Sequence, residues 1–379
     1  MSFVEKMDEV FRQKWHFKKE MPIQTKMIPE FLDGQDIVAQ SPTGTGKTLA
    51  FVLPLLHVVE GSKKQTQGLI IVPSQELAMQ ITDVIREWIK GTDITVAAMI
   101  GGANIKRQIE RLKKKPTIIV GTPGRLHELT KARKIKLFDI RHIILDEGDV
   151  LLSRDHRVMI KNMISGTHPE RQVVLVSATV TDEIERVATD FMEDPIFIRL
   201  AKKDLPNAGH VVHSYIETEV RDKTDLLRGL SHQPNMRGLA FVNHVDQVLM
   251  REMKLTYKKA PIVVLHAEMR SMERQEALQK FRKGQAKILI ATDLAARGLD
   301  ISGLTHVIHV DVPHTVEQYL HRSGRTGRAG EDGEVITFLS KKEIDDYEKL
   351  TKGIQTVEKV YRHGKLQDKS KPKPKRTFK

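Results

Sequence analysis

The sequence contains no cysteine, and it has no apolar run long enough to cross a membrane. Without cysteine, disulfides, thiolate metal sites and cysteine nucleophiles are excluded, and a reducing compartment is compatible with the composition. No stretch reaches the roughly 18 apolar residues of a membrane-spanning helix. The start, "MSFVEKMDEVFRQKW", carries charges where a signal peptide has an apolar segment. We therefore expect a cytoplasmic protein with no membrane partner.

Positive charge is concentrated at the end of the chain. Lys and Arg number 62 and Asp and Glu 49, for a net charge of +13. Residues 362–379 hold eight Lys or Arg and one Asp, so they contribute +7 of that total. We expect these residues to form a short basic, disordered tail. Such a tail can serve as a solubilising end or as a non-specific contact to nucleic-acid phosphates, and both interpretations stay open.

Short apolar runs alternate with longer amphipathic stretches, in two series. The runs lie at 36–40, 68–73, 117–122, 142–147 and 173–179, and then at 239–243, 262–266, 287–293, 306–313 and 334–340. Continuous apolar runs favour strands that are covered on both faces, as in parallel sheets. The alternation predicts an α/β fold with two tandem doubly wound domains.

The series is interrupted once, at "AKKDLPNAGH" (201–210), which shows no periodicity. This break predicts an N-terminal domain over 1–200, a linker over 201–210 and a C-terminal domain over 211–361. A cleft between two such domains is the usual place for a ligand.

A phosphate-binding loop is indicated by "SPTGTGKT" (41–48), which follows a strand and precedes a helical run. Glycines let backbone N–H groups turn toward phosphate oxygens, and the helix N-terminus favours negative charge. Lys47 would reach the terminal phosphates, and Thr48 would ligate Mg²⁺. A purely structural Gly-rich turn is the alternative. The expected nucleotide-binding residues are Ser41, Pro42, Thr43, Gly44, Thr45, Gly46, Lys47 and Thr48, although Ser41 stands where the strict motif has Gly.

Crowded carboxylates end the run in "RHIILDEGDVLLS" (141–153). A cation would offset their repulsion, so Asp146 is expected to hold Mg²⁺ through water. Glu147 would orient and deprotonate the water that attacks the γ-phosphate of ATP. A solvated acidic turn is the alternative, and it is less consistent with the Lys–Thr loop upstream.

A basic motif in the second series, "HRSGRTGR" (321–328), spaces Arg322, Arg325 and Arg328 three apart, along one face if the segment is helical. Planar guanidinium groups suit a transferring phosphoryl group. Arg325 and Arg328 are therefore candidate arginine fingers on ATP bound by the first domain. A solvated basic helix face is the alternative, and the nearby glycines argue against it.

Nine motifs in order carry a resemblance to DEAD-box ATP-dependent RNA helicases of helicase superfamily two, over residues 17–333. They are "PIQ", "SPTGTGKT", "PSQELA", "GG", "TPGR", "DEGD", "SAT", "ATDLAARGLD" and "HRSGRTGR". The resemblance implies two RecA-like domains with an interdomain cleft. It implies that Gln24 reads the adenine edge with Phe17 nearby, and that Asp300 contacts the ribose. It also implies coupling residues Asp149, Ser177, Thr179 and His321, and RNA-backbone contacts at Gly102, Thr122, Arg125 and Thr292.

The activity that the resemblance implies is RNA-stimulated ATP hydrolysis coupled to cleft closure. Closure would unwind short RNA duplexes or remodel RNA–protein complexes, with little sequence preference because contacts go to sugar and phosphate. We expect a monomer, with ribosomal RNA or ribosome precursors among its substrates. An ATP-gated RNA clamp with weak turnover and a DNA-directed translocase are the alternatives. The presence of Glu147 and Arg325 favours the enzyme.

The sequence departs from the family pattern at several positions. Gly148 replaces the alanine of the family's name. No catalytic atom is lost, so we expect hydrolysis to be retained but slower, because glycine loosens the backbone by about 0.5–1 kcal/mol. Gln75 stands where the family has arginine, which removes one phosphate contact. Ser323 replaces an isoleucine, with no consequence assigned. Phe3 is the nearest candidate for the aromatic residue upstream of the glutamine motif.

Overall fold

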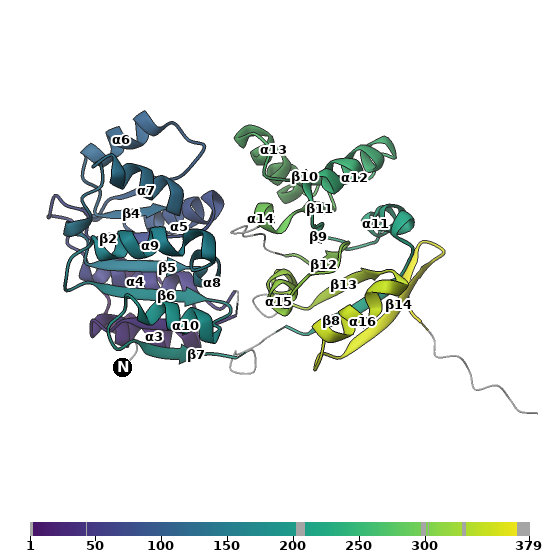
Figure 1. Cartoon of the computed structure of the whole chain (residues 1–379), viewed down its shortest axis with the longest axis horizontal. Helices are drawn as coiled ribbons and strands as arrows, with labels where there is room; N and C mark the ends of the chain where they lie inside the picture. The colour runs from purple at the N-terminus through teal and green to yellow at the C-terminus, as the bar shows by residue number, and fades with distance from the viewer. Residues whose placement is uncertain are drawn as a thin grey trace, which may run out of the picture. The chain divides into compact units, whose positions relative to one another are not determined.

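The computed structural model describes residues 3–42, 44–201, 209–296, 301, 303–327 and 331–369. The chain divides into two compact units, and the division falls inside the predicted linker (Figure 1). Three residues singled out from the sequence, Thr43, Asp300 and Arg328, lie outside the described residues, as do most of the linker and residues 370–379. No helix in the described ranges has the length and apolar character needed to span a membrane.

The N-terminal unit is built on a seven-stranded sheet in the order β3-β4-β2-β5-β6-β1-β7, and every pair of neighbours is parallel. Its strands are β1 (Ile37–Gln40), β2 (Gly68–Ile71), β3 (Val96–Met99), β4 (Ile118–Gly121), β5 (His142–Asp146), β6 (Gln172–Ser177) and β7 (Ile196–Arg199). Its helices are α1 (Phe3–Lys6), α2 (Glu9–Arg12), α3 (Pro22–Leu32), α4 (Lys47–Val58), α5 (Gln75–Trp88), α6 (Ile105–Lys113), α7 (Pro123–Lys131), α8 (Gly148–Leu151), α9 (Arg154–Ser165) and α10 (Asp182–Thr189), with a 3-10 turn η1 (Leu137–Asp139).

Both faces of this sheet are covered, as the continuous apolar runs predict. In β1, Ile37 and Ala39 belong to one hydrophobic core, and Val38 between them belongs to the other. The first core is closed by α1 to α5 and the second by α6 to α10. Figure 1 shows α9 and α10 in front of the sheet and α4 behind it. Alternate side chains of one strand therefore enter two different cores.

The C-terminal unit has an eight-stranded sheet in the order β10-β11-β9-β12-β13-β8-β14-β15, parallel except for the β14–β15 hairpin. Its strands are β8 (Val211–Glu217), β9 (Gly238–Phe241), β10 (Ile262–Leu265), β11 (Ile288–Ala291), β12 (His306–His309), β13 (Gly333–Leu339), β14 (Thr356–Arg362) and β15 (Lys365–Asp368). Its helices are α11 (Lys223–Ser231), α12 (Val245–Tyr257), α13 (Ser271–Arg282), α14 (Asp293–Ala296), α15 (Val316–Ser323) and α16 (Ile344–Leu350), with 3-10 turns η3 (Val220–Asp222) and η4 (Lys341–Glu343). The doubly wound prediction is confirmed for both units.

The end of the described part of the chain differs from the prediction. The basic tail was predicted to begin at residue 362, but β15 follows a tight turn and pairs with β14 in antiparallel register. The sequence pattern missed this hairpin because most of its side chains are half-buried or exposed and form no continuous apolar run. The same reason applies to β7 and β8, where buried and exposed side chains mix.

Candidate active site

The carboxyl ends of three neighbouring strands bring the predicted nucleotide residues together. In the order β5-β6-β1, β5 ends at Asp146, β6 ends at Ser177 and β1 leads into Ser41. The Ser41 N–H donates to the Ser177 carbonyl oxygen at 3.0 Å, which joins the loop after β1 to the end of β6. Ligands of open parallel sheets bind at this edge.

The loop after β1 closes around its own lysine. Lys47 Nζ donates to the carbonyl oxygens of Ser41 at 2.6 Å and Pro42 at 2.9 Å. Gly46 has φ +85° and precedes the first residue of α4, so the loop passes directly into a helix N-terminus. This conformation is open to glycine at little cost. The loop therefore leads into a helix N-terminus, where negative charge such as that of a phosphate is favoured.

The serine at the first position of the motif has a structural role. Ser41 is fully buried, and its Oγ lies 2.7 Å from Oγ1 of Thr45, which donates to the Pro42 carbonyl oxygen at 2.8 Å. This hydroxyl chain braces the base of the loop. Thr48, the expected Mg²⁺ ligand, is the second residue of α4 and is half-buried.

Gln24 ties α3 to the loop. Its Oε1 accepts from the Met21 N–H at 2.8 Å, and its Nε2 donates to the Gly46 carbonyl oxygen at 3.2 Å. A primary amide has two N–H donors, so one donor remains for an adenine edge. Phe17 is 54% exposed, and its ring meets Trp15 edge-on with centroids 5.1 Å apart. Phe3 is buried in the core, so it is not placed to stack on a base.

The acidic pair at the end of β5 consists of a buried Asp146 and a half-buried Glu147 with an unusual backbone conformation. Asp146 is 5% exposed, and its Oδ1 accepts from the Glu147 N–H at 3.0 Å. Glu147 has φ +57°, a left-handed conformation that is uncommon outside glycine and accumulates at functional sites. Burial, and then the neighbouring charge of Glu147, raise the pKa of Asp146 to about 7, although Lys47 acts in the opposite direction. A hard cation such as Mg²⁺ at this carboxylate would offset the repulsion between the two negative charges and favour the ionised form of Asp146.

The raised pKa predicts how stability changes with pH in metal-free protein. Between about pH 4 and pH 7 the folded Asp146 binds a proton that the unfolded chain has lost, so this residue lowers the free energy of unfolding as pH rises. Asp146→Asn should therefore stabilise the protein more at pH 8 than at pH 5, as measured by urea unfolding with EDTA. An equal effect at both pH values would contradict the assignment.

Three of the predicted coupling residues are joined by hydrogen bonds to one carboxylate. Ser177 Oγ donates to Asp149 Oδ1 at 2.6 Å, and Thr179 Oγ1 donates to Asp149 Oδ2 at 3.1 Å. The Thr179 N–H also lies 3.3 Å from Ser177 Oγ. The loop after β6 is thus fixed to the first turn of α8, beside the acidic pair. His321, the fourth predicted coupling residue, lies on α15 of the other unit.

Three of the RNA-contact residues implied by the resemblance, Gly102, Thr122 and Arg125, lie on the other half of the same edge, over β3, β4 and β2. Thr122 follows β4, and its N–H donates to the Met99 carbonyl oxygen at 3.1 Å. Arg125 Nη1 donates to the Ala103 carbonyl oxygen at 3.2 Å, beside Gly102. The sheet edge therefore holds a nucleotide half and an adjoining polar half.

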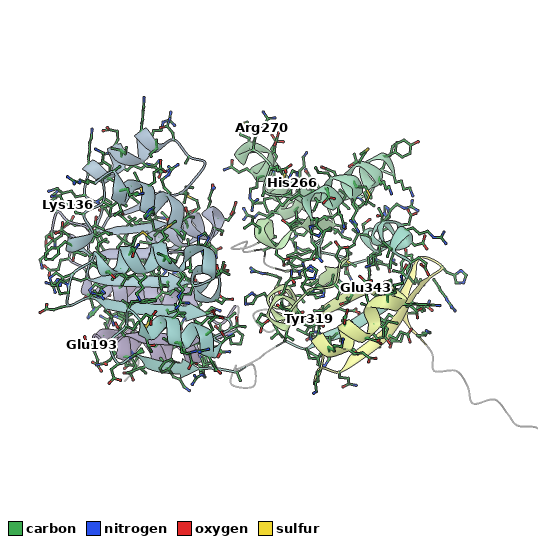
Figure 2. The ribbon with its side chains drawn as sticks, viewed as in Figure 1. Lys136, Glu193, His266, Arg270, Tyr319 and Glu343 are labelled. Carbon is green, nitrogen blue, oxygen red and sulfur yellow. The ribbon has the colours of Figure 1, made fainter. Side chains whose placement is uncertain are left out.

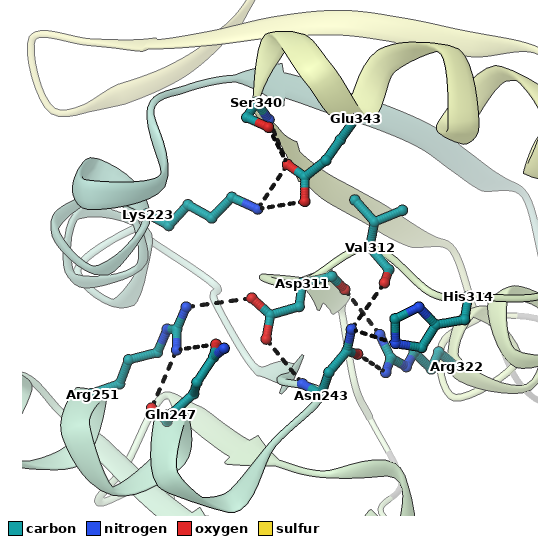
Figure 3. Close-up of polar contacts among 10 residues, drawn as sticks. All are labelled: Lys223, Asn243, Gln247, Arg251, Asp311, Val312, His314, Arg322, Ser340 and Glu343. Atoms are coloured by element: carbon teal, nitrogen blue, oxygen red, sulfur yellow. Dashed lines mark hydrogen bonds and ion pairs between the residues drawn. The ribbon is translucent and has the colours of Figure 1, made fainter.

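In the C-terminal unit, the prediction that Arg322 and Arg325 share one face of a helix is wrong. Helix α15 ends at Ser323, so Arg325 lies beyond the helix. Arg322 is 1% exposed and binds inward: Nε donates to Asp293 Oδ1 at 2.7 Å and Nη2 to Asn243 Oδ1 at 2.7 Å. Figure 3 shows its guanidinium beside Asn243, below Asp311.

Arg322 therefore has a structural role, because its hydrogen bonds join α15 to the residues that follow the strand ends. Sequence reasoning missed its partners, although Asp293 lies within the motif "ATDLAARGLD". Thr292, the predicted RNA contact beside it, is buried, and its Oγ1 accepts from the Ala295 N–H at 3.4 Å. Asp311 extends the same network to Arg251, whose Nη2 lies 3.4 Å from Asp311 Oδ1.

The loop, the acidic pair and two parallel-sheet units define a P-loop ATPase with two tandem domains. Comparison with known protein families identifies the group of ATPases to which the chain belongs. The DEAD/DEAH box helicase family matches residues 21–187, and the helicase conserved C-terminal domain matches residues 221–330. The chain belongs to the DEAD-box ATP-dependent RNA helicases.

Named relatives and solved structures agree with this membership. The chain is 41% identical to the probable ATP-dependent RNA helicase YfmL of Bacillus subtilis, over 97% of this chain and 98% of the relative. It is 41% identical to the helicase CshC of Bacillus cereus, over 90% and 88%. Dbp5 of S. cerevisiae bound to RNA and ADP BeF3 superimposes with a TM-score of 0.83 at 27% identity, covering 94% of this chain and 95% of Dbp5.

The predicted class of activity is thereby confirmed. The chain is an ATP-hydrolysing, ATP-dependent RNA helicase with two RecA-like units, and the clamp alternative is not favoured.

Proposed function

We propose that this helicase remodels folded RNA in the cytoplasm by cycles of Mg²⁺-dependent ATP hydrolysis. The observation that supports this best is the shared sheet edge, where the Ser41–Ser177 hydrogen bond joins the lysine loop to the strand beside the acidic pair. Lys47 would bind the β- and γ-phosphates, and Glu147 would take the proton of the attacking water.

We assign the Mg²⁺ site to Asp146 and Thr48. The donors present are a buried carboxylate and a hydroxyl, which are oxygen ligands of the kind that Mg²⁺ takes together with water and phosphate oxygens. The raised pKa of Asp146 supports this assignment, because the ionised carboxylate lacks a full counter-charge in the protein alone. When bound, the ion would neutralise charge on the phosphates.

The remaining nucleotide contacts are proposed from the motifs. Gln24 would bind the adenine edge through the side-chain N–H that does not donate to the Gly46 carbonyl oxygen. Arg325 and Arg328 would approach the γ-phosphate when ATP and RNA are both bound, and Asp300 would contact the ribose. Asp149, Ser177, Thr179 and His321 would couple the two ligands.

RNA would lie along the polar half of the edge, held through sugar and phosphate. Gly102, Thr122 and Arg125 would contact the backbone, with Thr292 from the C-terminal unit. Such contacts carry little sequence information, so the substrate would be defined by accessibility rather than by sequence. We propose ribosomal RNA or ribosome precursors as substrates and a monomer as the acting form.

The experiment that tests this function compares ATP hydrolysis with single-stranded RNA, with DNA of the same sequence and with neither. We expect RNA to raise kcat several-fold and DNA to have no such effect. A short RNA duplex with a single-stranded end should also be separated only when ATP is present. Equal rates in all three conditions would exclude the proposed function.

Gln75 provides a test of the RNA half of the edge. It begins α5, and its side-chain amide lies beside Gly101 and Gly102. We expect Gln75→Arg to tighten RNA binding and to steepen the dependence of log K on log salt by about 0.7, the value for one added phosphate contact on a single strand. The measurement is fluorescence anisotropy over a salt series. Gln75→Met should leave the slope unchanged, and an unchanged slope for the arginine variant would exclude a phosphate near residue 75.

A further inference from the structure

The amino-terminal edge of the sheet in the N-terminal unit carries exposed cations that the ATP and RNA residues do not use. They come before three neighbouring strands, in the order β4-β2-β5. None of these side chains has a carboxylate partner among the residues that the structure describes. We call this set the basic edge, and it comprises Lys64, Lys114, Lys115, Lys131, Arg133, Lys134 and Lys136.

The basic edge lies at the opposite end of the strands from the nucleotide loop. Because the three strands are parallel, all of them begin at one edge and end at the other. The strands rise about 3.3 Å per residue, so even the four-residue strands β2 and β4 separate the two edges by about 10 Å. Figure 2 shows Lys136 at the outer margin of the N-terminal unit. The cations therefore cannot be part of the site already described.

An exposed aromatic ring accompanies the cations of the basic edge. Phe138, in η1 just after Lys136, is 64% exposed. Its ring centroid lies 5.4 Å from that of His168, whose Nε2 is 2.8 Å from Nη2 of Arg141. The neighbouring imidazole packs against the ring, and much of the ring is left in solvent. Aromatic rings flanked by cations bind single-stranded nucleic acid by stacking on bases while the cations contact phosphates.

A helix-dipole interpretation explains only part of the pattern. Cations in the last turn of a helix or just beyond it interact with its terminal carbonyl groups. Lys114, Lys115, Lys131 and Arg133 follow or end α6 and α7, and this accounts for them. It does not account for the cations outside those turns or for an exposed phenyl ring.

Nearby acids do not cancel the charge. Glu110 pairs with Lys113 at 2.7 Å, and Glu170 pairs with Arg141 at 3.1 Å. Asp139 is the remaining acid in the segment 131–141, which contains five Lys or Arg. The edge is therefore strongly positive among the residues that the structure describes.

We propose that the basic edge and Phe138 form a second RNA-binding surface, which holds a single-stranded or looped segment apart from the ATP-coupled site. The proposal rests on RNA being the substrate of the proposed function. The surface contacts phosphates through cations and one base through Phe138, and it does not depend on the nucleotide state. The second surface keeps the protein bound to a long RNA while the ATP-coupled site at the opposite edge releases and rebinds its own segment of that RNA.

The test compares two variants with the same change in charge. The edge variant replaces Lys64, Lys114, Lys134 and Lys136 by glutamine. The control variant replaces four exposed cations of the C-terminal unit by glutamine: Lys280, Arg282, Lys283 and Lys352. Affinity for a long single-stranded RNA is measured without nucleotide over a salt series.

We expect the edge variant to lose about tenfold or more in affinity at low salt, with the log–log salt slope reduced by about 3 for four phosphate contacts. The control should lose little of either. Phe138→Ala should weaken binding about fivefold or more without changing the slope, because stacking is not ionic. Equal losses in the edge and control variants would overturn the proposal, as would unchanged RNA affinity combined with lost binding to vesicles containing anionic lipid.

These outcomes are distinct from failure of the proposed function. RNA stimulation of ATP hydrolysis is measured on the unaltered protein, and its absence would reject the function whatever the edge variants do. If stimulation is present and the edge variant binds long RNA normally, only the second surface is rejected. Matching thermal unfolding midpoints establish that the variants are folded.

Discussion

Glu147→Gln is expected to lower kcat for RNA-stimulated ATP hydrolysis by about 10²- to 10⁴-fold, the usual contribution of a positioned general base. The amide keeps the size and the hydrogen-bonding reach of the side chain but cannot accept a proton at neutral pH. The residue sits at the end of β5 in a left-handed conformation, next to the buried Asp146. Nucleotide binding should persist, because Lys47 and the loop are unchanged.

The measurement is steady-state ATP hydrolysis with saturating RNA, together with the affinity for a fluorescent ATP analogue. Glu183→Gln is the control, since Glu183 is an exposed acid on α10 of the same unit. A kcat within about threefold of the unaltered protein would remove Glu147 from its role as base. Loss of nucleotide binding together with activity would indicate a structural role instead.

Gly148→Ala is expected to destabilise the N-terminal unit and to slow hydrolysis. A Cβ built at residue 148 lies 2.6 Å from Cγ and 2.7 Å from Cδ2 of Leu175, a fully buried residue of β6. Cγ is the branch point of that side chain, so it cannot rotate away easily. Overpacking of this kind costs about 1–3 kcal/mol. Because residue 148 follows Glu147 directly, the strain would be felt at the catalytic carboxylate.

This expectation reverses the one drawn from the sequence. From the sequence, glycine was expected to loosen the backbone and slow the enzyme, so alanine should have helped. In the structure, Leu175 fills the space that an alanine methyl would occupy. The glycine is therefore explained by close packing between the start of α8 and β6.

A double-mutant cycle separates the two explanations. Leu175→Ala alone should cost about 2–5 kcal/mol through the cavity that it leaves. In Gly148→Ala/Leu175→Ala the new methyl enters that cavity, so the double variant should be more stable than the sum of the single effects by about 1–3 kcal/mol. It should also recover part of the lost kcat. Additive effects on urea unfolding, or a faster Gly148→Ala enzyme, would reject the packing explanation.

The core strands were predictable because they are covered on both faces. A run such as that of β1 divides its side chains between two cores, so nearly every residue is apolar and the pattern is unambiguous. Four strands lack this signal because solvent reaches some of their side chains: the edge strand β7, and β8, β14 and β15, the last three in the order of the C-terminal sheet. The sequence could not separate these strands from loop or tail.

The candidate site shows the same division. The spacing of Lys47, Asp146 and Ser177 after three strands was sufficient to predict that they share an edge, since parallel strands end together. The role of Arg322 was not predictable from its spacing to Arg325. Arg322 lies inside α15, and its burial against Asp293 and Asn243 depends on which face of the helix packs on the strand ends, which the spacing of the arginines does not determine. The bracing of the loop by Ser41 and Thr45 also required the three-dimensional contact.

ATP and RNA are expected to bind to this chain cooperatively, and the most direct test is the RNA affinity measured with and without ADP BeF3. We predict tighter RNA binding with the analogue and, by thermodynamic linkage, an equal factor in the affinity of the analogue when RNA is present. Equal RNA affinities in both conditions would exclude coupling between the two sites, because the two ligands would then bind independently.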